Sequence, residues 1–538
     1  MGKNTFQIPR TDTDISDIDQ NNDGYYILNT PDKIVRWINY QFEEQSIAGA
    51  NIPGHPPILH TINFTKCIIS TSEINNCSSM SLHDIAGKID CICKSNKHYN
   101  NKTIFHQEVL ENIRFYDCII NNGFFQQTKF HKDVIIIKSK FNRGTWDNCE
   151  FIGNLIIQDS KLNISGISFS TFHGTVSFSH SSISGIEFSF FKNQYKSDVT
   201  FNKVHFFIEN RNSTSKQPHI NFNHSSFDGI LLLIDIKWPC DCWFYYCSFK
   251  DSIFLTNNNT NHGIFFNRSV FENEFILHYY SDTSSALKPR INHLSLSFAY
   301  IYNRIHIENH NITSLQANYV TILNNGVLHL SNSYITTCNM TSIYNRGILF
   351  FQSNSISNIT LENVMNIGIV ELENTYIDIR NITNRKTARI LKDSAYKNNN
   401  IIDGLRYKYL ELELYRKEGN ISFTDQIILF FQKYSNTYGT NFLRGIYFTM
   451  ISAAIFFWLI NYFGTEKQIF ELGLNFYGFG EIWKKYLDVL NVLNFRTKLN
   501  DVELNAIGET LFLIAKIFIA YGMYQTVSAF RKYSKKQQ

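Results

Sequence analysis

The sequence has little proline and no strong excess of charge of either sign. Its 538 residues include 8 Pro, and 50 Lys and Arg against 46 Asp and Glu give a formal net charge of +4. Disordered chains have high net charge and few aromatic residues, whereas aromatic residues make up 15% of this chain. Nucleic-acid-binding domains are usually strongly basic. The composition therefore argues against a largely disordered chain and against nucleic acid as a partner.

The sequence also lacks the patterns that mark secretion and common catalytic sites. The first twenty residues contain no apolar stretch after the basic start, so we expect the ten cysteines to lie in a reducing compartment. No zinc-protease, nucleophile-elbow, Walker or dinucleotide motif is present. We therefore expect no enzyme activity and no cofactor.

Two cysteine groups lack the spacing of a zinc site. Cys91 and Cys93 form one group, and Cys240, Cys242 and Cys247 form the other. Neither has a matching pair of histidines, so we favour structural cysteines.

A partial calcium-loop pattern and three histidines are also weak signals. Asp19, Asn21, Asp23 and Gly24 match the front half of an EF-hand loop, but the twelfth position is a threonine instead of the bidentate acid. An acidic turn is the simpler interpretation. Three histidines lie beside the repeat positions described next, and we interpret them as solvated side chains: His131, His173 and His180.

Large apolar side chains recur at short, regular intervals from Phe115 onward. The steps between them are five, five, five and six residues, which add to a unit of 21. The residue two places earlier is small at most positions, as at Cys118, Ser139 and Ser160. Neither a helix nor an ordinary strand has this period. The pattern indicates a solenoid in which each coil has four sides.

We expect these large residues to share one interior. The same 21-residue spacing returns in stretches that begin at Gly326, Gly347 and Gly368. Longer stretches at 209–218 and 280–292 are predicted to leave the coils as loops, where binding sites are common. The predicted core residues are Phe115, Phe125, Phe130, Ile136, Phe141, Trp146, Phe151, Ile157, Phe172, Phe178, Phe188, Leu330, Phe351 and Leu372.

The repeat resembles the pentapeptide-repeat family, whose motif has Leu or Phe at its centre and a small residue two places earlier. Ser-Lys-Phe141, Ser-Thr-Phe172 and Cys-Ser-Phe249 follow that motif. The resemblance covers residues from about 60 to 380 and implies a mainly β fold, a right-handed quadrilateral β-helix. The extra residue in every fourth side departs from the family motif.

The segments on either side of the repeat have a different composition. Residues 1–59 contain a predicted helix at 31–45 and are expected to cap one end of the β-helix (60–380). Residues 381–440 are charged and favour helix, which predicts a helical linker or cap. Within it we expect an ion pair between Glu413 and Lys417 and a helix capped by Ser422 with Asp425.

The last part of the chain, residues 441–538, is predicted to be a transmembrane hairpin with a basic C-terminal tail. Residues 445–463 contain no charge, and 511–530 form a second apolar stretch, so both are long enough to span a bilayer. Their length and their Trp, Tyr and basic flanks favour spans over buried helices of a soluble domain.

Three polar residues of the hairpin are candidates for a function in the membrane: Glu509, Lys516 and Gln525. Lys516 lies inside the second span. Its side chain either snorkels to the nearer interface or lines a polar path between helices, and we favour snorkelling.

Charge placement predicts the topology of the hairpin. Lys433 and Arg444 precede the first span and four basic residues follow the second, so both termini are expected in the cytoplasm. Residues 476–495 suggest an interfacial helix or a partly re-entrant element, with a soluble linker as the alternative. Some relatives carry a potassium-filter loop at this place, but the run from Tyr477 to Gly480 lacks the residues that precede Gly-Tyr-Gly in such a filter, so selective conduction is not expected.

Membrane tails of this kind occur in bacterial pentapeptide-repeat proteins, and the resemblance implies the bacterial inner membrane. We expect a non-enzymatic scaffold or sensor that contacts the lipid bilayer and recognises a protein partner. The alternative is a homo-oligomeric effector that permeabilises the membrane in growth arrest or phage defence, for which Glu509 and Lys516 matter. A weaker alternative is a DNA-mimicking protector of a DNA enzyme, which the near-neutral charge disfavours.

Overall fold

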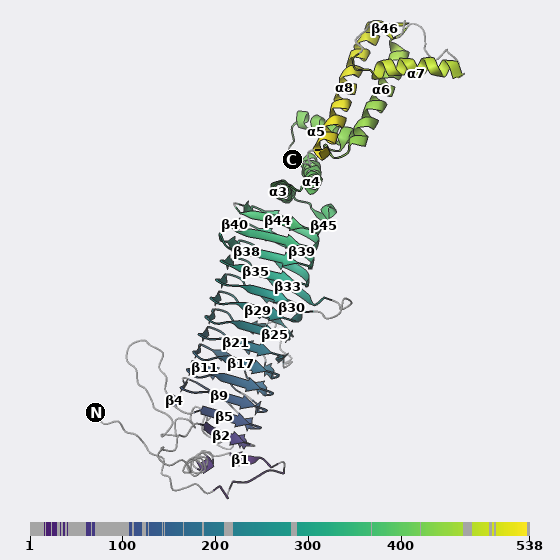
Figure 1. The fold of residues 1–538 in the computed structure, drawn as a ribbon. Coiled ribbons are helices and arrows are strands. Elements are labelled where there is room, and N and C mark those ends of the chain that lie inside the picture. Colours follow the sequence, from purple (N-terminus) through teal and green to yellow (C-terminus); the bar gives the residue numbers. More distant parts are fainter. Residues whose placement is uncertain are drawn as a thin grey trace. The chain divides into compact units, whose positions relative to one another are not determined.

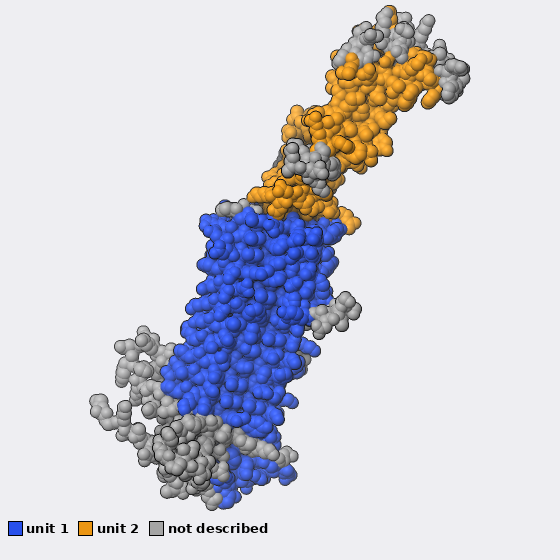
Figure 2. Space-filling view, viewed as in Figure 1, with its two compact units in different colours: residues 1–378 blue, residues 379–538 orange. Residues whose placement is uncertain are grey.

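The chain divides into two compact units, Met1–Asp378 and Ile379–Gln538 (Figure 2). The computed structural model describes the following residues: 15–16, 18–22, 24–28, 33, 36–37, 40, 61–65, 67–69, 107–109, 112–120, 125–126, 128–142, 144, 146–164, 166–185, 188–208, 219–280, 288–366, 368–419, 421–465, 476–493, 498–499 and 502–534. Most of the predicted helix at 31–45, together with Asp23, Cys91 and Cys93, lies outside them.

The first unit is a parallel β-solenoid, as the repeat predicts (Figure 1). In the described part of this unit the strands stack into sheets of 17, 13, 12 and 3 strands, named here A, B, C and D. Sheet A includes β1 (Tyr26–Leu28) and β45 (Tyr376–Ile377), and sheet B runs from β2 (Thr61–Thr65) to β44 (Ile369–Glu373). Sheet C runs from β4 (Gln107–Val109) to β43 (Met365–Asn366).

The coils between Val134 and Phe249 have four strands each, and in the later coils one longer strand of sheet A, beginning with β30 (Asn259–Phe265), replaces two of them. One well-ordered coil shows how four strands are joined. The backbone turns between the first two sides at Lys138 and between the last two at Asn148, with φ of 51° and 56°. Asn and Asp tolerate this left-handed conformation better than most residues. The four strands of this coil are β9 (Val134–Ile137), β10 (Lys140–Phe141), β11 (Trp146–Asp147) and β12 (Glu150–Phe151).

The predicted coil length is confirmed in two blocks of coils, but not between these blocks or at the N-terminal end, where Thr61 pairs with Asn112. Val134 pairs with Leu155, and Leu328 pairs with Leu349, so each pair is separated by one unit of the predicted length. Between β21 (Val199–Asn202) and β25 (Leu231–Ile234) the step is longer, because Val199 pairs with Leu231. The predicted excursion at 209–218 accounts for that step and lies outside the described residues. The second excursion is shorter than predicted, because β33 already begins at Arg290.

The predicted core residues lie inside the solenoid in columns that run from coil to coil. Phe130, Phe151 and Phe172 stack with ring centroids 4.8 Å apart, and Tyr195 continues the column at 5.0 Å. All the predicted core residues are buried except Leu372, which is only partly buried. Leu372 lies in the terminal strand of sheet B, where a neighbouring coil covers it on one side only.

The small residues two places before the core residues accept hydrogen bonds from backbone N–H groups of the preceding coil. The Ser139 N–H donates to Ser160 Oγ at 3.1 Å, and the Ser160 N–H donates to Ser181 Oγ at 3.1 Å. Each hydroxyl in turn donates to a carbonyl two residues earlier, as Ser139 Oγ does to the Ile137 carbonyl at 2.8 Å. A small polar side chain therefore takes up a backbone donor that would be costly to bury unpaired.

The second unit consists of helices, as its composition predicts. A tight antiparallel pair of strands, β46 (Lys498–Leu499) and β47 (Val502–Glu503), lies between the last two helices. The helices are α3 (Arg385–Lys397), α4 (Ile401–Lys417), α5 (Phe423–Asn436), α6 (Phe442–Phe463), α7 (Phe476–Leu490) and α8 (Ala506–Ser534), preceded by the short 3₁₀ helix η1 (Ile379–Asn381).

Helices α6 and α8 are the two helices long and apolar enough to cross a membrane in the described part of the chain. They are longer than predicted and pack against each other antiparallel (Figure 1). Glycines allow the close approach: a Cβ atom on Gly508 would lie 2.6 Å from the Gly464 carbonyl oxygen, and one on Gly445 would lie 2.5 Å from Thr526 Oγ1. Small residues at such crossings are typical of membrane helices.

Replacing one ring of the Phe130 column is expected to destabilise the coils locally. Phe151→Ala removes a fully buried ring between two others, which costs about 3–5 kcal/mol. Because repeat coils contact only their neighbours, amide hydrogen exchange should quicken mainly in β12 and the strands beside it. Thr171→Ala, on the outward side of sheet C, should leave exchange unchanged; equal effects of both changes would contradict the assigned core.

Candidate functional site

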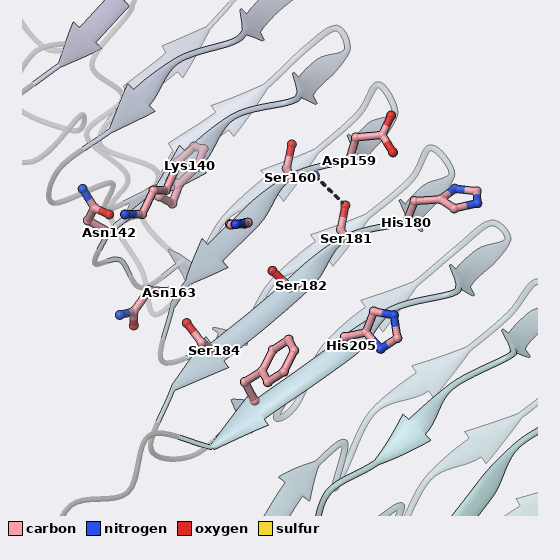
Figure 3. Close-up of a pocket in the computed structure, with 13 residues that line it drawn as sticks. Lys140, Asn142, Asp159, Ser160, Asn163, His180, Ser181, Ser182, Ser184 and His205 are labelled. Carbon is pink, nitrogen blue, oxygen red and sulfur yellow. Dashed lines mark hydrogen bonds between the residues drawn. The ribbon is translucent and has the colours of Figure 1, made fainter.

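The first candidate site is a shallow groove of about 640 Å³ on the outward face of sheet A (Figure 3). Two rows of side chains cross it. One row contains Lys140, Lys161, Ser182 and His205, which occupy matching positions in successive strands. The groove is thus polar and runs across four coils. Its second row consists of Asn142, Asn163, Ser184 and Phe207.

Successive coils supply this groove through β10, β14 (Lys161–Asn163), β18 (Ser182–Gly185) and β22 (His205–Ile208). Alternation along each strand sends Phe141 and Leu162 into the core and their neighbours outward. Asp159 and His180 lie at the adjoining corner, where both have positive φ. His180 is therefore exposed, as predicted, but it borders a groove that the sequence analysis missed.

A second cluster, of histidines on the outward face of sheet B, was also missed. The rings of His306 and His329 come from different coils and stack with centroids 4.3 Å apart. Glu308 Oε2 lies 3.0 Å from His278 Nδ1, and Arg304 lies 3.2 Å from His329 Nδ1. Burial, together with the nearby His329 and Arg304, lowers the pKa of His306 to about 4. Burial also lowers the pKa of His329, so both rings of the stack are neutral at pH 7.

The other sequence signals keep their structural interpretation. Cys240, Cys242 and Cys247 are buried in the core, and burial raises the pKa of the Cys247 thiol to about 12. The Asp19 carboxylate pairs with Lys33 at 3.4 Å and Asn21 accepts the Tyr25 N–H at 2.8 Å, which is the geometry of a turn. Among the described residues, no group of His, Cys, Asp and Glu is placed to hold a metal ion.

His131 is partly exposed beside the repeat positions, and His173 contacts Glu150 at 3.1 Å on the surface. Neither lies beside a nucleophile in the described contacts. These histidines therefore give no indication of a catalytic site.

The second candidate site is the membrane hairpin, where Lys516 lies between α8 and the end of α7. Lys516 is 3% exposed, and its Nζ donates to the carbonyl oxygens of Asp488, Val489 and Asn491 at 2.8, 3.1 and 2.6 Å. These are carbonyls at the C-terminus of a helix, which carries partial negative charge. The prediction that Lys516 snorkels is wrong, because α7 supplies acceptors inside the hairpin.

The C-terminal end of α7 packs deep against the hairpin. Val489 lies in a cluster with Phe457, Ile460 and Ala515 of the two long helices. The Tyr486 hydroxyl donates to the Met450 carbonyl of α6 at 3.0 Å. The predicted element between the spans is therefore a helix packed across them.

The remaining predicted residues of the hairpin lie apart from Lys516. Glu509 is exposed in the first turn of α8, a favourable place for an acidic side chain. The Gln525 side-chain oxygen accepts a hydrogen bond from Asn436 of α5. The structure therefore does not bring the three predicted residues together. The run from Tyr477 to Gly480 lies in the first turns of α7, so it is helical, unlike a filter loop.

The predicted pair between Glu413 and Lys417 is wrong. Glu413 instead pairs with Arg416 at 2.8 Å and with Lys433 of α5 at 2.9 Å, and accepts a hydrogen bond from Tyr438 at 3.2 Å. Although burial opposes the charge, these partners lower the pKa of Glu413 to about 2. Tertiary contact with α5 thus overrides the helical spacing. The predicted cap is confirmed, since the Asp425 N–H donates to Ser422 Oγ at 3.1 Å.

Comparisons with protein-family profiles, with curated proteins and with solved structures find no match to this chain. The fold and the two sites therefore rest on the residues themselves.

Acidification is expected to weaken the coils around the histidine stack. The pKa of His306 is lower in the folded chain than the ordinary value of about 6.5, so the unfolded chain binds more protons between these values and stability falls as pH drops from about 6.5 to about 4. Hydrogen exchange in β35 (Arg304–Glu308) and β38 (Val327–Ser331) should quicken over this range. His306→Phe should reduce the pH effect and the exposed His180→Gln should retain it; identical profiles would contradict this account.

Removing the Lys516 ammonium is expected to loosen α7. Lys516→Met removes the donor from three carbonyls, of which that of Val489 is buried and the other two are partly buried, at a cost of about 3 kcal/mol. Amide exchange in α7 should then quicken by about a hundredfold. Tyr524→Leu, at an exposed position of the same helix, is the matched control. Unchanged exchange in Lys516→Met would show that the ammonium does not hold α7.

Proposed function

We propose that the protein is a non-enzymatic scaffold or sensor, anchored in a membrane by α6 and α8, whose β-solenoid recognises a protein partner. The observation that carries the anchoring step is the outward face of the hairpin. Ile451, Trp458 and Ile517 are 58%, 54% and 61% exposed, and the rest of that face is similarly apolar. Such a continuous apolar surface is unfavourable in water and suits lipid tails.

The topology of the hairpin supports an orientation with both ends in the cytoplasm. The rings of Phe442 and Phe530 lie 5.8 Å apart, so the start of α6 and the end of α8 are neighbours. Arg444 and Arg531 consequently lie at the same end of the hairpin, and basic residues favour the cytoplasmic side. We assign this membrane to the bacterial inner membrane and the chain to the pentapeptide-repeat proteins, on the basis of the repeat motif and the solenoid.

Recognition is assigned to the solenoid because the regular pairing of its coils aligns outward side chains in long rows. Its interior is filled by apolar columns, so binding must use the outward rows of the sheets. The sheet A groove is the hollow in which several of these rows meet (Figure 3). Long solenoid surfaces of this kind are commonly used to bind other macromolecules.

A membrane-permeabilising effector is the second candidate, favoured by the position of α7. Glu481 and Lys484 pair at 2.9 Å with 49% and 66% of their side chains exposed, on a helix packed across the hairpin. Charged groups at membrane depth usually face water or other protein. An oligomer whose α7 helices line a polar path would satisfy that requirement.

Expression in bacteria distinguishes the two candidates. For the scaffold, the full chain should resist carbonate extraction from the membrane fraction, a truncation after Thr440 should be soluble, and both strains should keep their membrane potential and growth. Depolarisation that requires the tail and weakens in Lys516→Leu, but not in Tyr524→Leu, would contradict the scaffold and support the effector. A full chain recovered as a soluble protein would contradict both.

A further inference from the structure

The outward row of sheet A gathers lysine side chains from several coils. Lys140, Lys161 and Lys237 all belong to it, and His205 lies between the second and third of them. The three lysines are exposed, and in the described part of the chain none of their ammonium groups forms an ion pair. From β10 to β26 (Lys237–Trp238) the row contains no acidic residue.

Sheet C shows that this chain can compensate such charges. There Lys129 lies 3.0 Å from Glu150, and Asp228 lies 2.9 Å from Lys196 and 3.0 Å from Lys250. In sheet A, by contrast, Lys140 and Lys161 stand directly opposite each other in adjacent strands. Like charges in that position are destabilising. The row thus has a cost in stability that an external anion would remove.

The second row of the groove supplies hydrogen-bonding groups beside the charges. Asn163 pairs in register with Ser184, and Asn142 occupies the same position one coil earlier. Amide and hydroxyl side chains can donate to and accept from a peptide backbone. Phe207, which is 56% exposed, closes this row with an apolar surface. The two rows together match the needs of a peptide with acidic side chains.

We propose that the sheet A groove binds an extended acidic segment of a partner protein. Its carboxylates would contact the lysine row while its backbone contacts the row of Asn142, Asn163 and Ser184. This assignment rests on the proposed scaffold function and names the chemistry of its partner. Asp159 at the corner of the groove opposes any anion, and the two lysines that line the groove are few for a polyphosphate, so a sparsely charged acidic peptide fits better than a nucleic acid.

The test measures binding of a defined peptide to the full chain in neutral detergent micelles. The probe is a fluorescein-labelled peptide of alternating Glu and Ser, and its matched form has Gln in place of Glu. Fluorescence anisotropy should show binding of the acidic peptide that weakens with added salt, and weaker binding of the Gln form. In the double variant Lys140→Gln and Lys161→Gln, affinity should fall about tenfold or more, since each change removes a charge-assisted contact.

The control removes the same charge from sheet C, with Lys196→Gln and Lys250→Gln together. Affinity should be unchanged there. Equal loss in both double variants would overturn the site in favour of a net-charge effect. Absence of binding to the wild-type chain, or equally tight binding of an oligothymidylate of the same charge, would also overturn it.

These outcomes are separate from those of the scaffold test. If the chain is an inert membrane protein that does not bind the peptide, only the groove assignment fails. If the chain depolarises cells, the scaffold fails whatever the peptide does.

Discussion

The parallel pairing of each coil with the next is the constraint on which the solenoid depends. A strand of one coil has its hydrogen-bonding partners in the neighbouring coils, so residues at matching positions must be compatible with one another along the whole stack. Phe130, Phe151 and Phe172 meet this requirement by stacking rings, and Ser139 and Ser160 meet it by passing hydrogen bonds from coil to coil. Inward positions are therefore restricted to few residue types.

The same register governs the outward face, where it places residues far apart in sequence side by side. Acidic and basic side chains alternate on sheet C and neutralise each other, whereas lysines gather on sheet A. On sheet B the register brings His306 against His329. Each of these surfaces follows from the coil spacing without any change in the core. A solenoid can therefore carry different surface chemistry on each side of one interior.

The sequence predicted the solenoid and its core well, because side chains that recur at a fixed interval point in the same direction in successive coils. It also predicted α6 and α8, because an uncharged stretch such as 445–463 is long enough to span a bilayer. The sequence could not align Lys237 with the row of Lys140 and Lys161, because the step between coils varies: the step from His205 to Lys237 is longer than the step from Lys161 to Ser182. Only the observed pairing aligns them.

Tertiary contacts explain the other failures. The environment of Lys516 depends on where α7 ends in space, and the partners of Glu413 depend on the packing of α5. Spacing along a single helix contains neither kind of information. The sequence signal for the stack on sheet B is the interval from His306 to His329, which equals the length of the coil between them. The interval could be recognised as one coil only after the structure had given that length.

The central claim is that α6 and α8 hold the chain in a bilayer without opening it. The most direct test is flotation of the purified full chain with liposomes that contain trapped potassium ions, recorded together with release of the ions. The account predicts that the protein floats with the liposomes and that the ions stay inside. Release of the ions that depends on the protein, or protein that remains at the bottom of the gradient, would contradict it.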